Sequence, residues 1–118
     1  MFIKKDKKQK NENYDRVMKL HEQAAFLFYV NDAYEEKYEG KDYMKLEGIV
    51  AKGEGHVTDI YELFDCNGKK KSNITMEELY LGTDKVELLR GGDKRVALYP
   101  KEQDVDYRAG DILCIFDI

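Results

Sequence analysis

The chain has 118 residues, of which 42% are hydrophobic and 37% are charged, and its net charge at pH 7 is −4. This length suits one domain with its own core and is short for two domains. No apolar run approaches the roughly 20 residues that a membrane-spanning helix needs. The apolar run at 24–30 lies too far along the chain for a secretory signal and lacks a cleavage-like site. We therefore expect an intracellular, cytoplasmic protein in which Cys66 and Cys114 are free thiols.

The charges are unevenly distributed along the chain. Five lysines and one aspartate give residues 1–10 a charge of +4, so the other 108 residues carry −8. An acidic body opposes nonspecific binding to nucleic acid, which depends on Lys and Arg to neutralise phosphates. Because blocks of like charge rarely fold, residues 1–12 are predicted to form a basic flexible tail. The alternative to a free, solvated tail is a tail that contacts RNA or another acidic partner. No membrane partner is expected.

An N-terminal helix is predicted over residues 13–40. The segment 13–39 contains no Gly or Pro, Asn13 can cap its start, and Gly40 can end it. Residues 24–30 would be apolar on every side of that helix, so either the rest of the domain or a second copy of the chain would have to cover it. A strand at 24–30 is the competing interpretation, because Phe, Tyr and Val favour strands.

From residue 41 onward, short apolar runs alternate with glycines and charged turns, which is typical of a small antiparallel barrel or sandwich. A barrel leaves no open sheet edge. We therefore predict a mostly β (α+β) fold, in which the N-terminal helix packs on a six-stranded antiparallel barrel at 41–118. The six candidate strands are YMKLEGIVA (43–51), HVTDIYELF (56–64), ITMEELYLG (74–82), KVELLR (85–90), RVALYP (95–100) and DILCIFDI (111–118).

The sequence contains no recognisable catalytic or metal-binding pattern. The segment 60–79 partly resembles a calcium-binding EF-hand loop. However, lysines fall at ligand positions whether the loop is counted from Asp65 or back from Glu78. His56 and Asp59 would point to opposite faces of a strand, so they do not form a ready acid–base pair. No phosphate-binding loop and no zinc spacing is present. We predict no catalytic residue, no cofactor and no metal.

Candidate contact residues follow from the apolar run and from a lysine-rich loop. Tyrosine is favoured at interfaces because it buries area and keeps a polar tip, and the chain has nine tyrosines. Packing between helix and barrel is the other explanation for these tyrosines. The predicted partner interface consists of Phe26, Leu27, Tyr29, Val30 and Tyr34, and the predicted basic contact consists of Lys69, Lys70 and Lys71.

Two stretches, VELLRGGDKRVAL (86–98) and VDYRAGDIL (105–113), each place a Gly-Asp step before an apolar strand. Through these two Gly-Asp steps and the strands that follow them, the segment 43–118 resembles domain 2 of the translation GTPases, the β-barrel best known from elongation factor Tu. The resemblance implies that the aspartates of Gly92-Asp93 and Gly110-Asp111 cap turns. In that family the domain packs on a GTPase domain and helps to contact transfer RNA or the ribosome. The matched residues form the barrel, so the resemblance implies a fold and no active site.

Three hypotheses for the function remain open. The first is a small non-catalytic binding module of translation-factor-barrel type, with a protein or ribonucleoprotein partner. The second is a structural or assembly protein that forms a homodimer through its apolar helix. The third is an enzyme with a cleft between helix and barrel, in which His56 lies beside a carboxylate.

Overall fold

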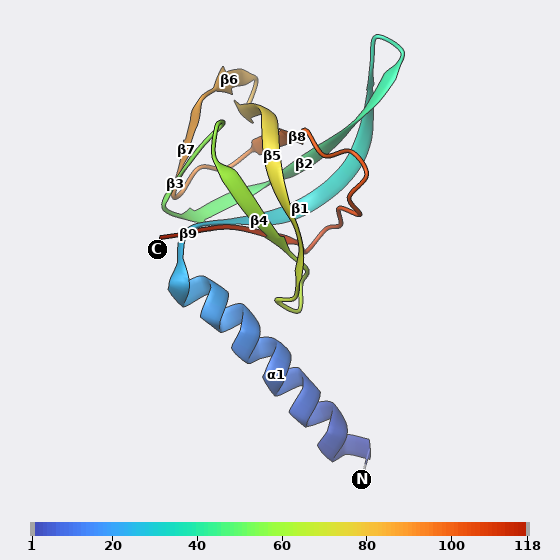
Figure 1. Ribbon diagram of the computed structural model, residues 1–118, viewed down its shortest axis with the longest axis vertical. Helices are drawn as coiled ribbons and strands as arrows, with labels where there is room; N and C mark the ends of the chain where they lie inside the picture. Colours follow the sequence, from blue (N-terminus) through green and yellow to red (C-terminus); the bar gives the residue numbers. More distant parts are fainter. Residues whose placement is uncertain (1, 118) are drawn as a thin grey trace.

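The computed structural model describes residues 2–117, with side chains from residue 12 onward. One helix is followed by nine strands (Figure 1). They are α1 (Phe2–Gln23), β1 (Ala24–Tyr38), β2 (Lys41–Lys52), β3 (Glu54–His56), β4 (Ile60–Phe64), β5 (Lys70–Leu81), β6 (Asp84–Val86), β7 (Leu88–Arg90), β8 (Val96–Pro100) and β9 (Ile112–Phe116).

Six of the strands close into a ring. The order in the main sheet is β4-β9-β1-β2-β8-β5-β6, and β4 also pairs with β5, so β6 lies outside the ring. Every pairing in the ring is antiparallel. The short strands β3 and β7 form a separate two-stranded sheet. The predicted fold, a mostly β chain with an N-terminal helix and a six-stranded antiparallel barrel, is confirmed.

The predicted helix at 13–40 is wrong in its second half, because α1 ends at Gln23 and β1 begins at Ala24. The physical reason is burial on both faces of β1. Phe26, Phe28 and Val30 belong to the main core, while Leu27 belongs to a second cluster that includes residues of α1. A strand covered on both faces has no polar side, so the alternation that normally identifies a strand is missing.

The predicted strand at 85–90 is also wrong in part. Its residues form β6 and β7, which separate at Glu87, and neither is a strand of the closed ring. The predicted strand at 56–64 contains a turn at 57–59 between β3 and β4. The number of barrel strands is nevertheless six, because β1 takes the place that residues 85–90 were expected to fill.

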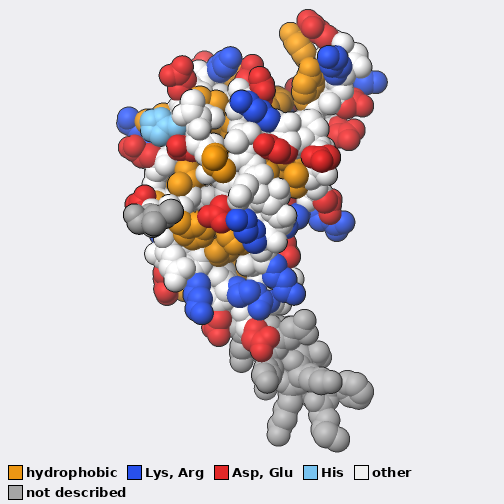
Figure 2. Space-filling view, viewed as in Figure 1, with side chains coloured by type: hydrophobic (Ala, Val, Ile, Leu, Met, Phe, Trp, Pro, Cys, Tyr) orange, Lys and Arg blue, Asp and Glu red, His pale blue; other side chains and the backbone are white. Residues whose placement is uncertain are grey.

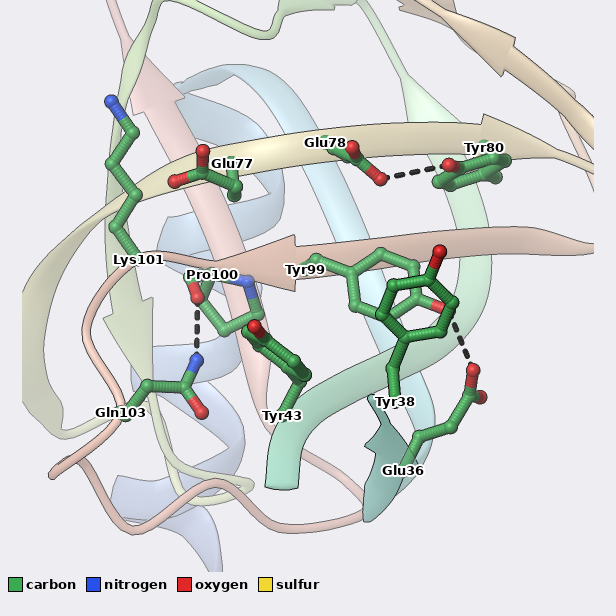
Figure 3. Close-up of a pocket in the computed structure, with 10 residues that line it drawn as sticks. All are labelled: Glu36, Tyr38, Tyr43, Glu77, Glu78, Tyr80, Tyr99, Pro100, Lys101 and Gln103. Atoms are coloured by element: carbon green, nitrogen blue, oxygen red, sulfur yellow. Dashed lines mark hydrogen bonds between the residues drawn. The ribbon is translucent and has the colours of Figure 1, made fainter. Parts of the chain in front are cut away.

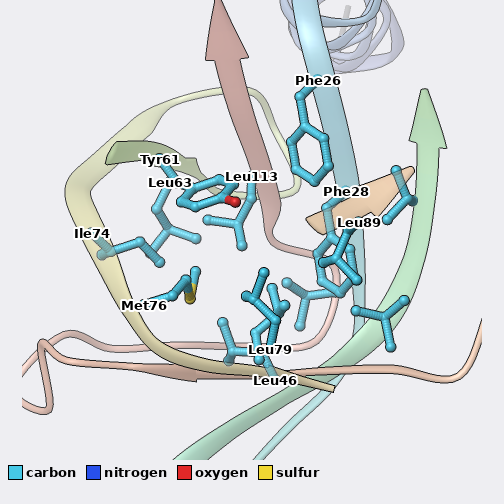
Figure 4. Close-up of a cluster of buried hydrophobic side chains, with 14 of the residues drawn as sticks. Phe26, Phe28, Leu46, Tyr61, Leu63, Ile74, Met76, Leu79, Leu89 and Leu113 are labelled. Atoms are coloured by element: carbon cyan, nitrogen blue, oxygen red, sulfur yellow. The ribbon is translucent and has the colours of Figure 1, made fainter. Parts of the chain in front are cut away.

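Buried side chains from most of the strands fill the barrel interior (Figure 4). The rings of Phe26 and Tyr61 meet edge to face, with centroids 5.5 Å apart. The Tyr61 hydroxyl donates to the carbonyl of His56 over 2.6 Å, so the polar end of this buried ring has a partner. The main core comprises Phe26, Phe28, Val30, Leu46, Val50, Tyr61, Leu63, Ile74, Met76, Leu79, Leu89, Val96, Leu98, Tyr107 and Leu113.

The two Gly-Asp turns have the same geometry, as the resemblance implied. Asp93 accepts the backbone N–H of Arg90 over 2.7 Å, and Asp111 accepts that of Arg108 over 2.8 Å. Both glycines have positive φ, 95° at Gly92 and 93° at Gly110. Each turn also hydrogen-bonds with both backbone groups of one valine, Val50 in β2 for the first and Val30 in β1 for the second. The turns therefore join the ends of β8 and β9 to the neighbouring long strands.

The helix α1 contacts the barrel through its C-terminal half. Leu20 is buried in the second cluster with Leu27 and Phe64, and Arg16 Nε donates to the carbonyl of Asn67 over 3.0 Å. Both cysteines are free, as expected. The expectation of a flexible tail at 1–12 stays a prediction; the structure gives helix from Phe2 onward. Within the part of the chain that is described, no helix has the length and apolar character to cross a membrane.

Candidate binding surface

A two-stranded arm extends from one end of the barrel (Figure 1). We call residues 31–45 the arm: the neighbouring strand β9 pairs with β1 only as far as Tyr29, and β8 pairs with β2 only at 46–48. The arm turns at Glu39-Gly40, where φ is 49° and 79°. Positive φ at both central residues is the signature of a type I′ hairpin, whose twist matches that of the flanking strands.

A groove of about 770 Å³ lies between the arm and the outer face of β5 and β8 (Figure 3). Four tyrosines and three glutamates dominate its lining. The arm contributes Glu36, Tyr38 and Tyr43; β5 contributes Glu77, Glu78 and Tyr80; and β8 with the loop after it contributes Tyr99, Pro100, Lys101 and Gln103. These ten residues, which we call the groove, combine aromatic faces with carboxylates.

Two of the tyrosines form the barrel-side wall. The rings of Tyr80 and Tyr99 meet edge to face with centroids 5.7 Å apart. The Tyr80 hydroxyl donates to Glu78 over 2.7 Å, and this hydrogen bond raises the pKa of Tyr80. The Tyr99 hydroxyl donates to Glu36 over 3.3 Å, and burial is the main cause that raises the pKa of Tyr99. Both hydroxyls therefore stay protonated at neutral pH.

At the base of the arm, a lysine ammonium is already held by rings and carboxylates. Lys45 Nζ lies 3.1 Å from Glu36 and 3.7 Å from Glu47. The same atom lies 5.8 Å from the ring centre of Tyr34 and 6.0 Å from that of Tyr99. Burial lowers the pKa of Lys45, but hydrogen bonds to Glu36 and Tyr34 outweigh burial, so this pKa is raised. The site stabilises an ammonium by cation–π contact and ion pairing together.

The groove is held in shape by its own hydrogen bonds. Gln103 accepts the backbone N–H of Met44 in the arm over 2.9 Å and donates to the carbonyl of Pro100 over 2.7 Å. The neighbouring Glu102 accepts both the N–H and the hydroxyl of Thr75, over 2.7 and 2.8 Å. The arm, the loop after β8 and strand β5 are therefore tied together before any partner binds, which reduces the entropy cost of binding.

The charge left in the groove is negative on balance. Lys45 balances Glu36, as described above. Lys85 lies 3.4 Å from Glu78, but both side chains are solvent-exposed, so this pair is weak. Glu77 is exposed, and Lys101 is the one cation among the lining residues. The groove therefore offers two carboxylates, Glu77 and Glu78, beside tyrosine rings.

The predicted partner interface at 26–34 needs correction. Phe26, Leu27 and Val30 are 0%, 1% and 2% exposed, because they pack in the barrel and under α1. Their side chains are not available to a partner. Tyr29 is half-buried, and its hydroxyl oxygen lies 3.2 Å from His21 Nδ1, so this contact joins β1 to α1. Tyr34 is 37% exposed, and its hydroxyl donates to Glu47 in β2, just beyond the arm.

Two of the three lysines predicted as a basic contact have structural partners. Lys70 Nζ lies 2.8 Å from Glu62 on the neighbouring strand β4. Lys71 Nζ lies 2.9 Å from the buried carboxylate of Asp111. Lys69 is exposed in the loop that Asp65 caps. The positive charge of this segment is thus largely balanced by the barrel itself.

The structure also bears on the reasons behind the two alternative hypotheses. The homodimer hypothesis rested on an apolar helix at 24–30, and this segment is a barrel strand with buried side chains. The enzyme hypothesis required a cleft between helix and barrel with His56 beside a carboxylate. His56 ends β3 on the surface, and its backbone N–H, not its ring, bonds Asp59. The groove lies instead between the arm and β5–β8.

The groove is not predicted from the sequence, because residues 31–40, which form the first strand of the arm and its turn, are expected to be helical. A signal was present: Tyr34, Glu36 and Tyr38 alternate before Glu39-Gly40, and Tyr43 and Lys45 alternate after it. Alternation on both sides of a two-residue turn indicates a hairpin. The aromatic partners on β5 and β8 are 42 or more residues away from Tyr38 in the chain, so only the closed barrel brings them together.

The fold of this chain is similar to that of known proteins. Among solved structures, the chain is similar to translation elongation factor SelB from Methanococcus maripaludis in its apo form, with a TM-score of 0.59 and 21% identity over 75% of this chain. The fold is translation-factor-like. No protein-family model and no curated protein matches the chain. The chain corresponds to 18% of the length of that SelB chain, and the likeness concerns the fold alone. The finer assignment to a domain 2 barrel stays a prediction.

Proposed function

We propose that the protein is a non-catalytic binding module of translation-factor-barrel type, and that it binds a protein partner in the groove between the arm and the barrel. The observation that carries this proposal is the gathering of Tyr38, Tyr43, Tyr80 and Tyr99 around one groove. Tyrosine supplies large contact area at a low cost in side-chain entropy, which is why it is enriched at the centres of protein interfaces.

Exposure and rigidity of the groove support the same function. Tyr38 on the arm is 64% exposed and Tyr43 is 38% exposed, so their rings are available to a partner. The barrel-side wall is fixed by the hydrogen bonds of Tyr80 and Tyr99. An exposed aromatic pair facing a fixed aromatic wall is suited to hold an extended segment of another chain.

Selection from a library of random peptides tests this function. Peptides enriched on the full-length protein are expected to lose binding to the Tyr38→Ala/Tyr43→Ala variant, because truncating two interface tyrosines removes most of the contact area on the arm. The control is Tyr14→Ala, since Tyr14 is 64% exposed like Tyr38 but belongs to α1, which contributes no residue to the groove. Peptides that bind both tyrosine variants equally well would contradict the proposal.

A ribonucleoprotein partner is a second candidate, and the separation of charge favours it. Five lysines fall within residues 1–10, at the start of α1, while the rest of the chain is acidic. In Figure 1 this end of α1 extends away from the barrel. A helix that carries the positive charge beyond an acidic body is able to contact phosphates without bringing the carboxylates of the barrel close to them.

A salt series with single-stranded RNA tests this second candidate. If all five lysines contact phosphates, the logarithm of the association constant is expected to fall with the logarithm of salt with a slope of about −3.5. Replacing the five lysines with glutamine should abolish both the binding and the slope in a filter-binding assay. Retention that is absent at low salt, or that survives the replacement, would remove the ribonucleoprotein candidate.

A further inference from the structure

The ligand class of the groove follows from its carboxylates and tyrosine rings, and this inference rests on the proposed function. We propose that the groove binds an extended, basic segment of a partner protein, with a Lys or Arg side chain seated against the tyrosine rings beside Glu77 and Glu78. The groove then recognises positive charge, and the aromatic rings supply both contact area and attraction for the cation.

The composition of the lining favours a cationic ligand. Four tyrosines present π faces, whose negative potential attracts an ammonium or guanidinium group within about 6 Å. Glu77 and Glu78 supply formal negative charge on β5, next to Tyr80. A phosphate-bearing ligand would be repelled by these carboxylates, so a nucleic acid is disfavoured here. The lining holds three glutamates and one lysine, Lys101, so its formal charge is −2 and charge complementarity favours a cation.

The protein already holds one lysine ammonium between tyrosine rings and a carboxylate. Lys45 places its own ammonium between Glu36 and the faces of Tyr34 and Tyr99. The arrangement is built from the same residue types as the open part of the groove, and both use β1 and β2. It shows that rings and carboxylates at this spacing hold a lysine head group in this fold. Tyr38, Tyr43 and Tyr80 repeat the combination with Glu77 and Glu78 a short distance along the groove (Figure 3).

The form of the groove favours an extended ligand. Small-molecule pockets are mostly apolar and enclose their ligands. Here the lining comes from two sides, the arm and the β5–β8 face, and its aromatic surface is interrupted by carboxylates. A volume of about 770 Å³ exceeds what one side chain occupies. An extended chain with side chains that alternate between groove and solvent fits this shape, and its backbone can bond the polar rim.

The remainder of the molecule favours approach by a cation. Residues 11–118 carry a net charge of −8, so the barrel has a long-range attraction for basic segments. Figure 2 shows Asp and Glu side chains over the arm and the neighbouring barrel surface. This field accelerates association but is screened by salt, so binding of a basic segment should weaken as the ionic strength rises.

The test measures the affinity of two labelled nine-residue peptides for the full-length protein by fluorescence anisotropy. One peptide carries four lysines that alternate with glycine and serine, and the other has glutamine in place of each lysine. We expect the lysine peptide to bind at least about tenfold more tightly, because it gains one or more cation–π contacts and ion pairs. Equal affinities of the two peptides would overturn the inference.

Charge-reversal variants locate the binding. Glu77→Lys/Glu78→Lys should weaken the lysine peptide at least about tenfold. The matched control is Glu12→Lys/Glu22→Lys, which makes the same change in net charge at two exposed positions on α1. If the two double variants weaken binding equally, the attraction is a property of the whole molecule and the groove is not its site.

Aromatic variants separate the rings from their hydroxyl groups. Tyr38→Ala/Tyr43→Ala should weaken the lysine peptide, and Tyr38→Phe/Tyr43→Phe should restore it, since the ring face carries the cation–π contact. Loss of binding in the Phe variant as well would contradict a role for the ring faces. Both residues are exposed, so neither change is expected to unfold the barrel.

The outcomes distinguish this inference from the proposed function. If library-selected peptides depend on the groove but carry no cationic residue, the ligand class is wrong and the binding module stands. If no selected peptide depends on the groove, the proposed function fails. Sedimentation of the full chain could instead show self-association that Glu77→Lys/Glu78→Lys removes. The occupant of the groove would then be the lysine-rich segment of a second copy, and the inference that a different protein supplies the basic segment would be overturned.

Discussion

Lys71→Met is expected to lower the free energy of unfolding by about 3 kcal/mol, because it leaves a buried carboxylate without its cation. Lys71 Nζ lies 2.9 Å from Asp111 Oδ2 and also donates to the carbonyl of Asp106. Asp111 is 2% exposed, so its carboxylate is almost fully removed from solvent. Urea denaturation measures the loss.

The neighbouring lysine provides the control. Lys70 forms an ion pair of similar length with Glu62, but these side chains are 47% and 32% exposed, against 18% and 3% for Lys71 and Asp111. Lys70→Met should therefore change the free energy of unfolding by less than about 1 kcal/mol. Adding Asp111→Asn to Lys71→Met should recover part of the loss, since Asn keeps an acceptor for the Arg108 N–H and removes the charge. Equal losses in the two single lysine variants would refute this account of Lys71.

Gly53→Ala is expected to lower the free energy of unfolding by about 3 kcal/mol or more. Gly53 has a φ of 80°, and a Cβ at this position would lie 1.8 Å from the carbonyl oxygen of Ala25 in β1. Relief of that contact requires the backbone of β1 or β2 to move, at a cost of about 1–3 kcal/mol. The positive φ adds about 1 kcal/mol or more for any residue with a Cβ.

Gly40→Ala isolates the second of these effects. Gly40 has a φ of 79°, nearly the same as Gly53, but nothing lies within 4 Å of its Cβ position at the tip of the arm. We expect a loss of about 1 kcal/mol in Gly40→Ala from backbone strain alone. The difference between the two variants, measured by urea denaturation, reports the close approach of β1 and β2. Equal losses would show that strain, not contact, governs both positions.

The arm connects this architecture to the proposed function. An isolated two-stranded hairpin is only marginally stable in water. The arm lacks strand partners beyond Tyr29 and Leu46, and it depends instead on side-chain links to the barrel, through Gln103 and Lys45. These links also form one end of the groove. Because these links hold the arm in place before a partner binds, the groove is expected to change little in shape on binding.

The sequence by itself determined the β character of residues 43–118 and the two capped turns. Turn chemistry is local: Gly92 and Gly110 supply positive φ, and Asp93 and Asp111 bond backbone groups three residues away. Such contacts need no information from elsewhere in the chain. The similarity to a translation-factor fold, which the Gly-Asp spacing suggested, is supported at the level of the fold by the structural match to SelB.

Only the tertiary structure decided that residues 24–38 form a strand and where the groove lies. Helix and strand propensity compete in the apolar run at 24–30, and burial on two faces removed the alternation that would have favoured the strand. Pairing of β1 with β9, 80 or more residues away in the chain, resolved the choice. The groove depends on closure of the ring in the same way, because Tyr38 and Tyr43 reach Tyr80 and Tyr99 only when β2, β8 and β5 lie side by side. Local patterns fix local turns, whereas a site assembled from distant strands is set by the register of long-range pairing, which no short stretch of sequence contains.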